Sequence, residues 1–498
     1  MKTDTIAAIA TAMSDSGIGI IRVSGDEAVE IVNKIYQNVH YEKILKKYKS
    51  HTIHYGFITE EDGTIIDEVM VSVMKGPRSY TMEDTVEINC HGGILMMQKI
   101  LSIVMKAGAR IAEPGEFTKR AFLNGRIDLS KAEAVMDIIH AKNEFALRSS
   151  IKQLKGSVSD KIKKLREEIL YEIAFIESAL DDPEHISLEG YQERLLSKSE
   201  DIILNLDKLL DSADDGRILK EGIHTVIVGK PNVGKSSLLN ILAGKERAIV
   251  TDVAGTTRDT LEETITLDNI TLNVIDTAGI HNTEDIVEKI GVEKAKKISE
   301  EADLILYVID ASMPLDESDR DIIKMIMQKK TIILLNKSDL KEMIDEQSVV
   351  DVMNNITSDT LSLIKTDHYQ FVKKEAEKND HLTYQKIKGT DHPVYIIKTS
   401  TKEEYGIELL TFLIKDMFFH GQLSYNDEVY ITNARHKEAI LDAKNSILEV
   451  RKSLEMNMPE DFYSIDLMSA YASLGLIIGE EVGDDLVNEI FSKFCMGK

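Results

Sequence analysis

The pattern of apolar and polar positions changes several times along the chain. Up to about residue 118, apolar runs of strand length alternate with short helical stretches, a pattern typical of an α+β domain. The strand-like runs are GIGIIRVSG, HTIHYGFIT, IIDEVMVSVM and DTVEINC. We therefore predict a compact N-terminal domain over residues 1–118.

Helical periodicity follows this domain. Between Ile151 and Leu180, apolar residues recur at every third or fourth position, which predicts one amphipathic helix of about 30 residues. A second helical pattern covers residues 190–213, and DSADDGR at 211–217 has the composition of a linker. Since the helical pattern returns after about residue 421, we predict a helical domain in two segments, 119–215 and 421–498.

Residues 216–420 lie between the two helical segments and have a different pattern. Apolar runs of strand length alternate with helices, as in a buried and mostly parallel sheet. The runs are HTVIVG, LNVIDTAG, LILYVIDAS, TIILLNKSD and VYIIKTS. The simplest arrangement inserts this α/β domain into the helical domain, because insertion is tolerated where chain ends lie close together. Residues 342–392 are polar and charged, which predicts a surface elaboration.

Composition narrows the class of protein. The 498 residues are enough for two or three domains, and a net charge of −25 disfavours a passive nucleic-acid coat. The segment from Lys142 to Arg166 is locally rich in lysine and arginine. It is either a solvated helix face or a contact to a phosphate backbone.

Cysteine content and hydropathy favour a cytoplasmic location. The only two cysteines, Cys90 and Cys495, suit a reducing compartment. No apolar run reaches the roughly 18 residues of a transmembrane helix, so no membrane partner is expected. A signal peptide is disfavoured because Asp4 interrupts the charged start and the apolar run leads directly into a predicted strand.

The strongest motif is GKPNVGKS at 229–236, which matches G-x-x-x-x-G-K-[ST] between a predicted strand and the helix SSLLNILAG. Loop amides and a helix N-terminus cradle phosphates in such a site. We expect Lys235 to act catalytically on the β and γ phosphates and Ser236 to hold Mg²⁺. The predicted GTP contacts in this loop are Asn232, Val233, Gly234, Lys235, Ser236 and Ser237.

Two further segments, GTTRD at 255–259 and DTAG at 276–279, complete the phosphate side. Thr257 is expected to bind Mg²⁺, Asp276 to contact it through water, and Gly279 to donate its amide to the γ-phosphate. The predicted contacts here are Thr251, Asp252, Val253, Ala254, Gly255, Thr256, Thr257, Asp276, Thr277, Ala278 and Gly279.

The base side is predicted by NKSD at 336–339 and TSTK at 399–402. Asp339 can accept two hydrogen bonds from the N1–H and N2–H₂ donors of guanine. Adenine lacks that pair of donors, and buried acceptors without partners are costly. The predicted contacts are Asn336, Lys337, Asp339, Ser400, Thr401 and Lys402.

Asn232 suggests a monovalent cation. Its carboxamide oxygen could coordinate K⁺ beside the β–γ bridge, with carbonyl ligands from residues 251–257. Such an ion would replace an arginine finger, an effect on the order of a thousandfold. The alternative is that Asn232 only caps a turn. The predicted potassium ligands are Asn232, Thr251, Val253 and Thr256.

The motifs, taken in order, resemble those of the MnmE (TrmE) family of tRNA-modifying GTPases. They are GIGIIRVSG, VEINCHGG, PGEFTKRAFLNGRIDLSKAEAVMDII, GKPNVGKSSLLN, TDVAGTTRDTLEE, DTAGI and the terminal FCMGK. The resemblance implies an N-terminal α+β folate-binding domain, a discontinuous helical domain and an inserted, potassium-activated, Ras-like P-loop GTPase domain.

The resemblance also implies how water is positioned. Ile280 occupies the place of the glutamine that orients water in common regulatory GTPases, and an isoleucine cannot do so. Family members use a glutamate that matches Glu288, whereas the residues alone leave Glu284 and Asp285 open.

In the N-terminal domain the resemblance implies dimerisation around a tetrahydrofolate derivative, 5-formyl- or methylene-tetrahydrofolate. The implied contacts are Arg22, Glu87, Arg126 and Lys498. A carboxylate such as Glu87 suits the donor edge of a pterin. The alternative is that Glu87 pairs with Arg22 without any ligand.

The function implied by the resemblance is tRNA modification by a homodimer. With an FAD-binding MnmG-type protein, in a heterotetramer or larger assembly, it would add a carboxymethylaminomethyl-type group to C5 of the wobble uridine of certain tRNAs. Two other functions stay open, a ribosome-assembly GTPase switch and a folate enzyme whose GTPase domain only regulates it.

Overall fold

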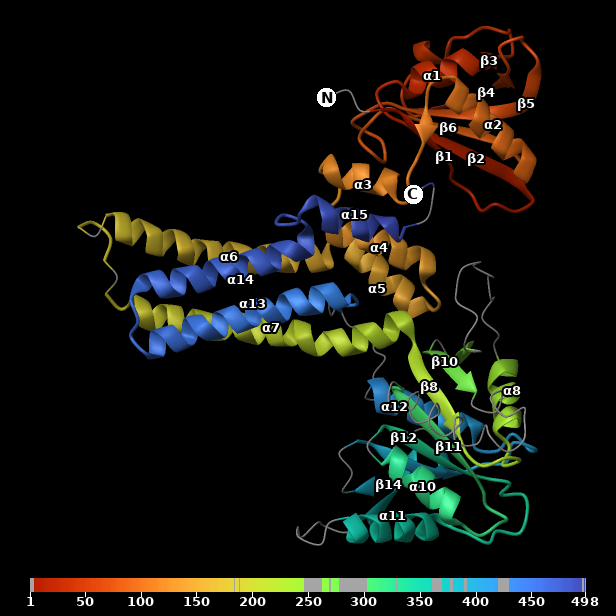
Figure 1. The fold of residues 1–498 in the computed structure, drawn as a ribbon, viewed down its shortest axis with the longest axis vertical. Coiled ribbons are helices and arrows are strands. Elements are labelled where there is room, and N and C mark those ends of the chain that lie inside the picture. Colours follow the sequence, from red (N-terminus) through yellow and green to blue (C-terminus); the bar gives the residue numbers. More distant parts are fainter. Residues whose placement is uncertain are drawn as a thin grey trace. The chain divides into compact units, whose positions relative to one another are not determined.

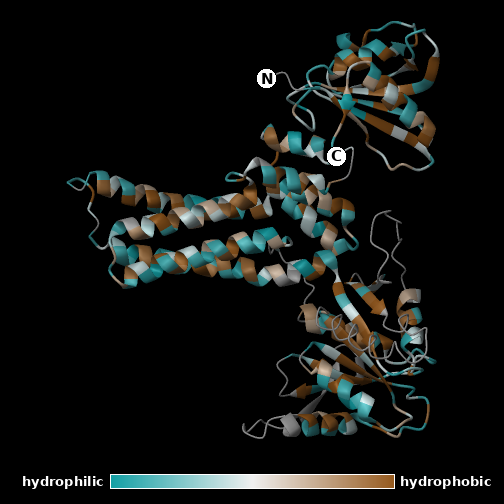
Figure 2. Ribbon diagram, viewed as in Figure 1, coloured by the Kyte–Doolittle hydropathy of each residue, from teal (hydrophilic) through white to brown (hydrophobic). Residues whose placement is uncertain are grey.

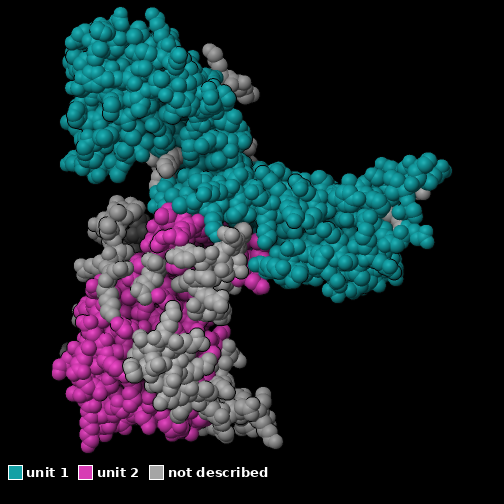
Figure 3. Space-filling model, turned by 180° about the vertical axis from the view of Figure 1, so that it is seen from behind, with its two compact units in different colours: residues 1–140, 150–208, 435–498 teal, residues 141–149, 209–434 magenta. Residues whose placement is uncertain are grey.

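The computed structural model describes residues 4–182, 184–187, 189–245, 262–267, 270–276, 302–327, 329–360, 370–376, 379–388, 392–419, 430–494 and 497. The chain forms two compact units, coloured separately in Figure 3. Unit 1 contains residues 1–140, 150–208 and 435–498, and unit 2 contains residues 141–149 and 209–434. The chain therefore leaves unit 1, forms unit 2 and returns.

Unit 1 begins with a seven-stranded sheet in the order β3-β4-β5-β6-β2-β1-β7 (Figure 1). Its strands are β1 (Ile6–Ile9), β2 (Ser16–Ser24), β3 (Tyr36–Asn38), β4 (Thr52–Thr59), β5 (Ile65–Met74), β6 (Thr85–Gly92) and β7 (Arg110–Ile111). All neighbours are antiparallel except β1 and β7. One apolar core joins the sheet to α1 (Ala28–Ile35) and α2 (Ile94–Lys106), which confirms the predicted α+β fold.

The rest of unit 1 is helical. Its helices are α3 (Glu116–Leu123), α4 (Leu129–His140), α6 (Ser157–Asp181), α13 (Ala434–Glu455), α14 (Glu460–Ile478) and α15 (Asp484–Ser492), with parts of α5 (Glu144–Leu154) and α7 (Tyr191–Glu221). Figure 2 shows the alternating hydrophilic and hydrophobic colouring of the long helices. α6 and α14 lie side by side, so segments distant in sequence form one helical layer.

Two predictions about these helices were wrong. The single helix predicted from Ile151 to Leu180 is two helices, because Gly156 has φ of 108° and separates α5 from α6. Such a left-handed conformation favours glycine. The apolar spacing hides the break because it continues in phase across it.

The linker predicted at 211–217 belongs instead to α7, which continues to Glu221. Gly216 is required there for close packing, since a Cβ atom would lie 2.3 Å from the carbonyl oxygen of Ile431. The glycine marks a close approach of two backbone segments and not a break in the helix.

The basic segment from Lys142 to Arg166 was predicted to be either a solvated helix face or a phosphate contact. Arg166 does not lie on a solvated face, because its side chain is buried and pairs with Glu480.

Unit 2 has an eight-stranded sheet in the order β13-β14-β15-β12-β11-β8-β10-β9. Its strands are β8 (Ile223–Val228), β9 (Glu262–Leu267), β10 (Ile270–Asp276), β11 (Leu304–Asp310), β12 (Thr331–Asn336), β13 (Gln370–Ala376), β14 (Asn379–Lys388) and β15 (Val394–Lys398). Its helices include α8 (Lys235–Lys245), α10 (Glu317–Ile326), α11 (Glu346–Thr360) and α12 (Ile407–Phe419). The five strands β10, β8, β11, β12 and β15 are parallel, as predicted.

Apolar residues cover both faces of this sheet. Every residue of β11 and β12 is buried, and two core clusters draw on α12 and on α10 with α11. The segment 342–392 was predicted as a surface elaboration, but it is partly core. Val349, Val350 and Met353 of α11 are buried, and β14 pairs with β15. The polar composition of the whole segment obscured the apolar face of α11 in the sequence.

Across the part of the chain that the structure describes, no helix has both the length and the apolar character needed to cross a membrane.

Candidate functional site

The predicted phosphate loop lies between β8 and α8 in unit 2. Gly229 and Gly234 have φ of 149° and 106°, and Asn232 has φ of 62°. A Cβ atom on Gly229 would lie 2.3 Å from the oxygen of Val308, and one on Gly234 would lie 2.3 Å from Nδ2 of Asn336. Both glycines of the motif are therefore fixed by close approach and by backbone conformation.

Lys235 places a positive charge at the N-terminus of α8. Its Nζ donates hydrogen bonds to the carbonyl oxygens of Gly229, at 2.8 Å, and Lys230, at 2.7 Å, and only 7% of the residue is exposed. Ser236 and Ser237 follow it and are exposed. An ammonium group beside the amides of a helix N-terminus is suited to anions such as phosphates.

Asn336 joins the phosphate side to the base side. The residue is fully buried at the end of β12. Its Nδ2 donates to the carbonyl oxygen of Val233 at 2.8 Å and to Oγ1 of Thr401 at 3.2 Å, and its Oδ1 accepts from the amide of Thr401 at 3.0 Å. The sequence motif did not predict this bracing role, which follows from the loops meeting at the ends of the parallel strands β8, β12 and β15.

Asp339 is exposed and oriented by one hydrogen bond. The hydroxyl of Ser400 donates to its Oδ1 at 2.7 Å. This hydrogen bond, with the nearby charges of Lys402 and Lys337, holds the pKa of Asp339 below its ordinary value. Lys337, with φ of 62°, also pairs with Asp310 at 2.6 Å. The structure thus places Lys337, Asp339, Ser400 and Lys402 together after β12 and β15. The other three residues stabilise the ionised carboxylate of Asp339, which can accept hydrogen bonds.

Lys230 is a supporting residue that sequence reasoning missed. Its Nζ lies 2.6 Å from Oδ2 of Asp319 and 2.9 Å from Oδ2 of Asp316. Burial lowers the pKa of Lys230, but hydrogen bonds to these two carboxylates raise it above its ordinary value. Asp316 and Asp319 form the capping box of α10, and Tyr307 donates to Asp319 at 2.8 Å. The phosphate loop is therefore fastened to the start of α10. The DESD capping pattern predicts where that helix begins, but not that Lys230 pairs with it.

Several predicted nucleotide, metal and catalytic residues lie outside the described residues. They are Thr251, Asp252, Val253, Ala254, Gly255, Thr256, Thr257, Thr277, Ala278, Gly279 and Glu288. Asp276 ends β10 opposite Ile227 of β8. Of the residues predicted to bind metal ions directly, the structure describes only Ser236 for Mg²⁺ and Asn232 for K⁺.

The predicted folate contacts meet in unit 1. Arg22 of β2 and Glu87 of β6 are paired in register, and their side chains form an ion pair at 2.8 Å. Nη1 of Arg22 also donates to the carbonyl oxygen of Gly497 at 3.0 Å. Lys498 and Cys495 lie outside the described residues, but their neighbour Gly497 reaches the pair.

Tyr80 connects Arg22 with Arg126 and was not predicted. The guanidinium carbons of Arg22 and Arg126 lie 5.8 Å and 4.7 Å from the centre of its ring. Arg126 also donates to the carbonyl oxygen of Tyr80 at 3.1 Å, and the hydroxyl of Tyr80 lies 2.9 Å from Oγ1 of Thr118. No spacing rule connects residues 22, 80 and 126, so only the fold could reveal this arrangement.

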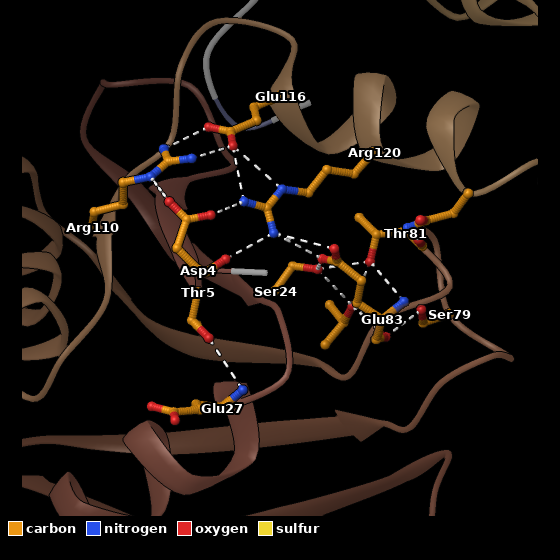
Figure 4. Close-up of polar contacts among 12 residues, drawn as sticks. Asp4, Thr5, Ser24, Glu27, Ser79, Thr81, Glu83, Arg110, Glu116 and Arg120 are labelled. Atoms are coloured by element: carbon orange, nitrogen blue, oxygen red, sulfur yellow. Dashed lines mark hydrogen bonds and ion pairs between the residues drawn. The ribbon is translucent and has the colours of Figure 1, made fainter. Parts of the chain in front are cut away.

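An ion-pair network fastens the loop that carries Tyr80 to α3 (Figure 4). Arg120 of α3 contacts Glu83 at 3.2 Å, Glu116 at 3.0 Å and Asp4 at 2.8 Å. Arg110 binds Glu116 at 2.6 Å and also pairs with Asp4. Burial raises the pKa of Glu116, but its hydrogen bonds with Arg110, the amide of residue 113 and Arg120 bring the pKa below its ordinary value. The charged form is therefore the stable form in this buried setting.

Comparison with known proteins covers the whole chain. A family model described as "MnmE helical domain" matches residues 129–495, and one described as "GTP-binding protein TrmE N-terminus" matches residues 5–126. A protein of Lachnoclostridium phytofermentans named "tRNA modification GTPase MnmE" is 54% identical over 498 residues, covering 100% of both chains. One of the same name from Thermoanaerobacter pseudethanolicus is 46% identical over 499 residues, again covering 100% of both.

Among solved structures, a variant of Aquifex aeolicus Era bound to GDP and AlF4⁻ is 25% identical and covers 45% of this chain and 67% of that chain. Its TM-score of 0.25 is too low to support any argument. The full-length relatives and the helical-domain match are sufficient without it: the chain belongs to the MnmE family of tRNA modification GTPases.

Proposed function

We propose that the protein is a potassium-activated GTPase of tRNA modification. With an FAD-binding MnmG-type partner, it would add a carboxymethylaminomethyl-type group to C5 of the wobble uridine of certain tRNAs, using a tetrahydrofolate one-carbon unit. The observation that carries the GTPase part is Asn336, which binds both the phosphate loop at Val233 and the base loop at Thr401. The tRNA substrate follows from the names of the relatives.

The donor atoms of the phosphate loop fit the two metal ions. Ser236 presents an exposed hydroxyl at the start of α8, and hydroxyl oxygens are ligands that Mg²⁺ accepts. The side chain of Asn232 is exposed and makes no hydrogen bond within the described part of the chain, which favours a ligand over a turn cap. Bound there, the ions would neutralise charge that develops on the phosphates.

The residues of the chain would divide the remaining work. Lys235 and the amides at the start of α8 would hold the β and γ phosphates, while Asp339, oriented by Ser400, would select guanine. Glu288 would position the attacking water, since Ile280 cannot. GTP hydrolysis would then change the conformation of the GTPase domain. For this domain we keep the predicted bounds 216–420.

The Arg22–Glu87 pair would bind the pterin of the folate. Only Oε1 of Glu87 bonds to Arg22, and Oε2 makes no hydrogen bond with the described residues. That oxygen could accept from the donor edge of a pterin. Arg126 and Lys498 would contact the remainder of the ligand.

The uncovered face of the N-terminal sheet supports a homodimer. Ile53, Tyr55 and Met70 are exposed on it, at 65%, 47% and 50%. The sheet register aligns Ile53, Ser72, Glu87 and Arg22 across four strands, so the apolar patch and the folate pair share one face. A second copy of this chain would cover both, because exposed apolar patches mark interaction sites.

Mass spectrometry of nucleosides from bulk tRNA tests the whole proposal. A deletion strain should lack the wobble-uridine modification, and a plasmid copy should restore it. Normal modification together with defective ribosomal subunits would favour the ribosome-assembly alternative. Modification restored by a chain that cannot hydrolyse GTP would favour a folate enzyme with a regulatory GTPase domain.

A further inference from the structure

Helix α14 is apolar on its outer side as well as on its inner side. It packs on α6 (Figure 1), and the residues buried on its inner side include Tyr463, Leu467, Ala470 and Leu474. On the outer side, Phe462, Ile465 and Met468 are 49%, 67% and 56% exposed. Because they follow one another at intervals of three, each lies beside the next on the helix. A helix that is apolar all round is normally buried, so the outer side of α14 is suited to a partner.

The apolar surface continues onto α6 at Leu170, which is 46% exposed. Two contacts show which side of α6 faces α14. The guanidinium carbon of Arg166 lies 3.9 Å from the centre of the Tyr471 ring, and the hydroxyl of Ser464 donates to Oε1 of Glu177 at 2.9 Å. Leu170 follows Arg166 by four residues and precedes Glu177 by seven, so it lies on the same side of α6, between the two contacts. We call Leu170 and the three exposed residues of α14 together the α14 surface.

Acidic side chains border the α14 surface. Glu177 lies on its α6 side, and Glu460 begins α14. Asp466 lies on the α13 side, since burial and then the charge of Glu449 on α13 raise the pKa of Asp466. Glu449 pairs with Lys452 at 3.2 Å, but in the part of the chain that the structure describes the other three carboxylates pair with no lysine or arginine. The border therefore carries negative charge.

The sequence around the α14 surface has the same sign of charge. Between residues 453 and 492 there are nine acidic residues and no lysine or arginine, although Glu480 and Glu481 pair with Arg166 of α6. Such a region repels the phosphates of RNA and of anionic lipids. Two copies of the surface would place like charges against each other. A protein segment with apolar side chains flanked by lysine and arginine is complementary to it in both respects.

We propose that the α14 surface binds the FAD-binding protein partner through an amphipathic helix with a basic border. This inference rests on the proposed function, which requires one protein partner besides a second copy of this chain. The uncovered face of the N-terminal sheet is assigned to the second copy, whereas the charge of the α14 surface disfavours self-association. Apolar residues of the partner helix would pack against Ile465 and its neighbours, and its basic residues would meet Glu177 and Asp466.

Binding of the purified FAD-binding protein from the same genome to the full-length chain, measured by biolayer interferometry, tests the inference. Ile465→Ser should weaken this binding about tenfold or more, because truncating a central apolar anchor removes a large share of interface energy. Leu204→Ser is the matched control, since Leu204 is an exposed leucine of α7, outside the α14 surface, and it should bind as the wild type does. Potassium-stimulated GTP hydrolysis by the chain alone should be unchanged in both variants.

Salt tests the charged border. Added salt should weaken partner binding by the wild type, and it should weaken binding less in Asp466→Asn, because that variant has lost one border charge. An affinity that does not depend on salt in either protein would contradict a basic partner segment.

The remaining outcomes are distinguishable. Equal affinity of the partner for the wild type and for Ile465→Ser would overturn the binding surface and leave the proposed function intact. If the partner did not bind the wild type, the partner in the proposed function would be wrong, and this inference with it. A shift of Ile465→Ser from dimer to monomer with partner binding retained would assign the surface to a second copy and overturn the inference. Loss of tRNA affinity in that variant, again with partner binding retained, would assign it to RNA and do the same.

Discussion

In the candidate nucleotide site, three loops that follow the parallel strands β8, β12 and β15 of one sheet are linked by the side chains of Asn336 and Ser400. In the N-terminal site, Arg22, Glu87 and Tyr80 come from separate strands and loops, and side-chain charge defines the geometry. The difference teaches that the first site depends on loops placed at the ends of parallel strands, whereas the second depends on the ion-pair network that positions its side chains. Substitutions should therefore have different effects in the two sites.

The largest expected effect lies on the nucleotide side, where one ion would replace an arginine finger. Steady-state phosphate release should be faster in K⁺ than in Na⁺ at matched ionic strength, by on the order of a thousandfold. Asn232→Ala should remove the potassium response with little change in nucleotide affinity, because Lys235 remains in place.

Glu288→Ala should be slow even in saturating K⁺, since it removes the residue proposed to orient water. Equal rates of the wild type in the two salts would contradict the potassium mechanism. Fast hydrolysis by Glu288→Ala would contradict the proposal that Glu288 orients the attacking water.

On the N-terminal side, the network around Arg120 should respond most. Arg120→Met leaves Glu83 without its arginine partner and leaves Glu116 with Arg110 alone, and breaking a buried pair costs about 3–5 kcal/mol of unfolding free energy. Hydrogen exchange of β2 and β6 should accelerate, and folate binding should weaken, with GTP binding unchanged. Arg451→Met removes an exposed pair with Glu455 and should change stability by less than about 1 kcal/mol. If both variants behaved alike, the network would not position the site.

A smaller effect is expected at the base side of the nucleotide site. Asp339→Asn should weaken GTP binding about tenfold or more and move preference towards xanthine nucleotides, since the amide no longer presents two acceptors. Ser400→Ala, which removes the hydroxyl that donates to Asp339 and accepts from the amide of Glu403, should weaken GTP binding by less than Asp339→Asn. Nucleotide titrations monitored by fluorescence provide the comparison, and unchanged GTP affinity in Asp339→Asn would refute base recognition by this carboxylate.

The smallest effect is a pH dependence confined to the N-terminal side. Asp4 and Glu116 have pKa values below their ordinary 3.8 and 4.5, held there chiefly by Arg110 and Arg120 against the effect of burial. Their contribution to stability is present above about pH 4.5 and is lost as the pH falls through the lowered pKa values. Protection of β1 against hydrogen exchange should fall in that window, and the fall should be shallower in Arg120→Met. An equally steep fall in the variant would place its cause in other groups.

The comparison also explains how far the sequence could predict the molecule. GKPNVGKS and NKSD each follow a buried strand, so their position at the ends of parallel strands could be deduced from local pattern. The pairing of Lys230 with Asp319 and the placement of Tyr80 could not, because nothing local encodes contacts between distant segments. Arg22, Glu87 and Arg126 were chosen only through the family resemblance.

Glycines caused the errors in the helical region. At Gly156 a left-handed residue separates two helices whose apolar spacing is continuous, and at Gly216 a glycine serves close packing within an unbroken helix. Local composition cannot distinguish these two uses of glycine, since each depends on what the residue contacts.

The bond between Arg22 and Gly497 has a consequence for biosynthesis. The two residues are 475 positions apart, so a ribosome must synthesise almost the entire chain before Arg22 acquires this partner. Unit 2, with the α12 residues of its core, is complete by residue 434, and it can fold while α14 and α15 are still being translated. A polypeptide released early would therefore keep a nucleotide site without a finished N-terminal site. Abortive products could sequester GTP, and their turnover would fall to cellular proteases.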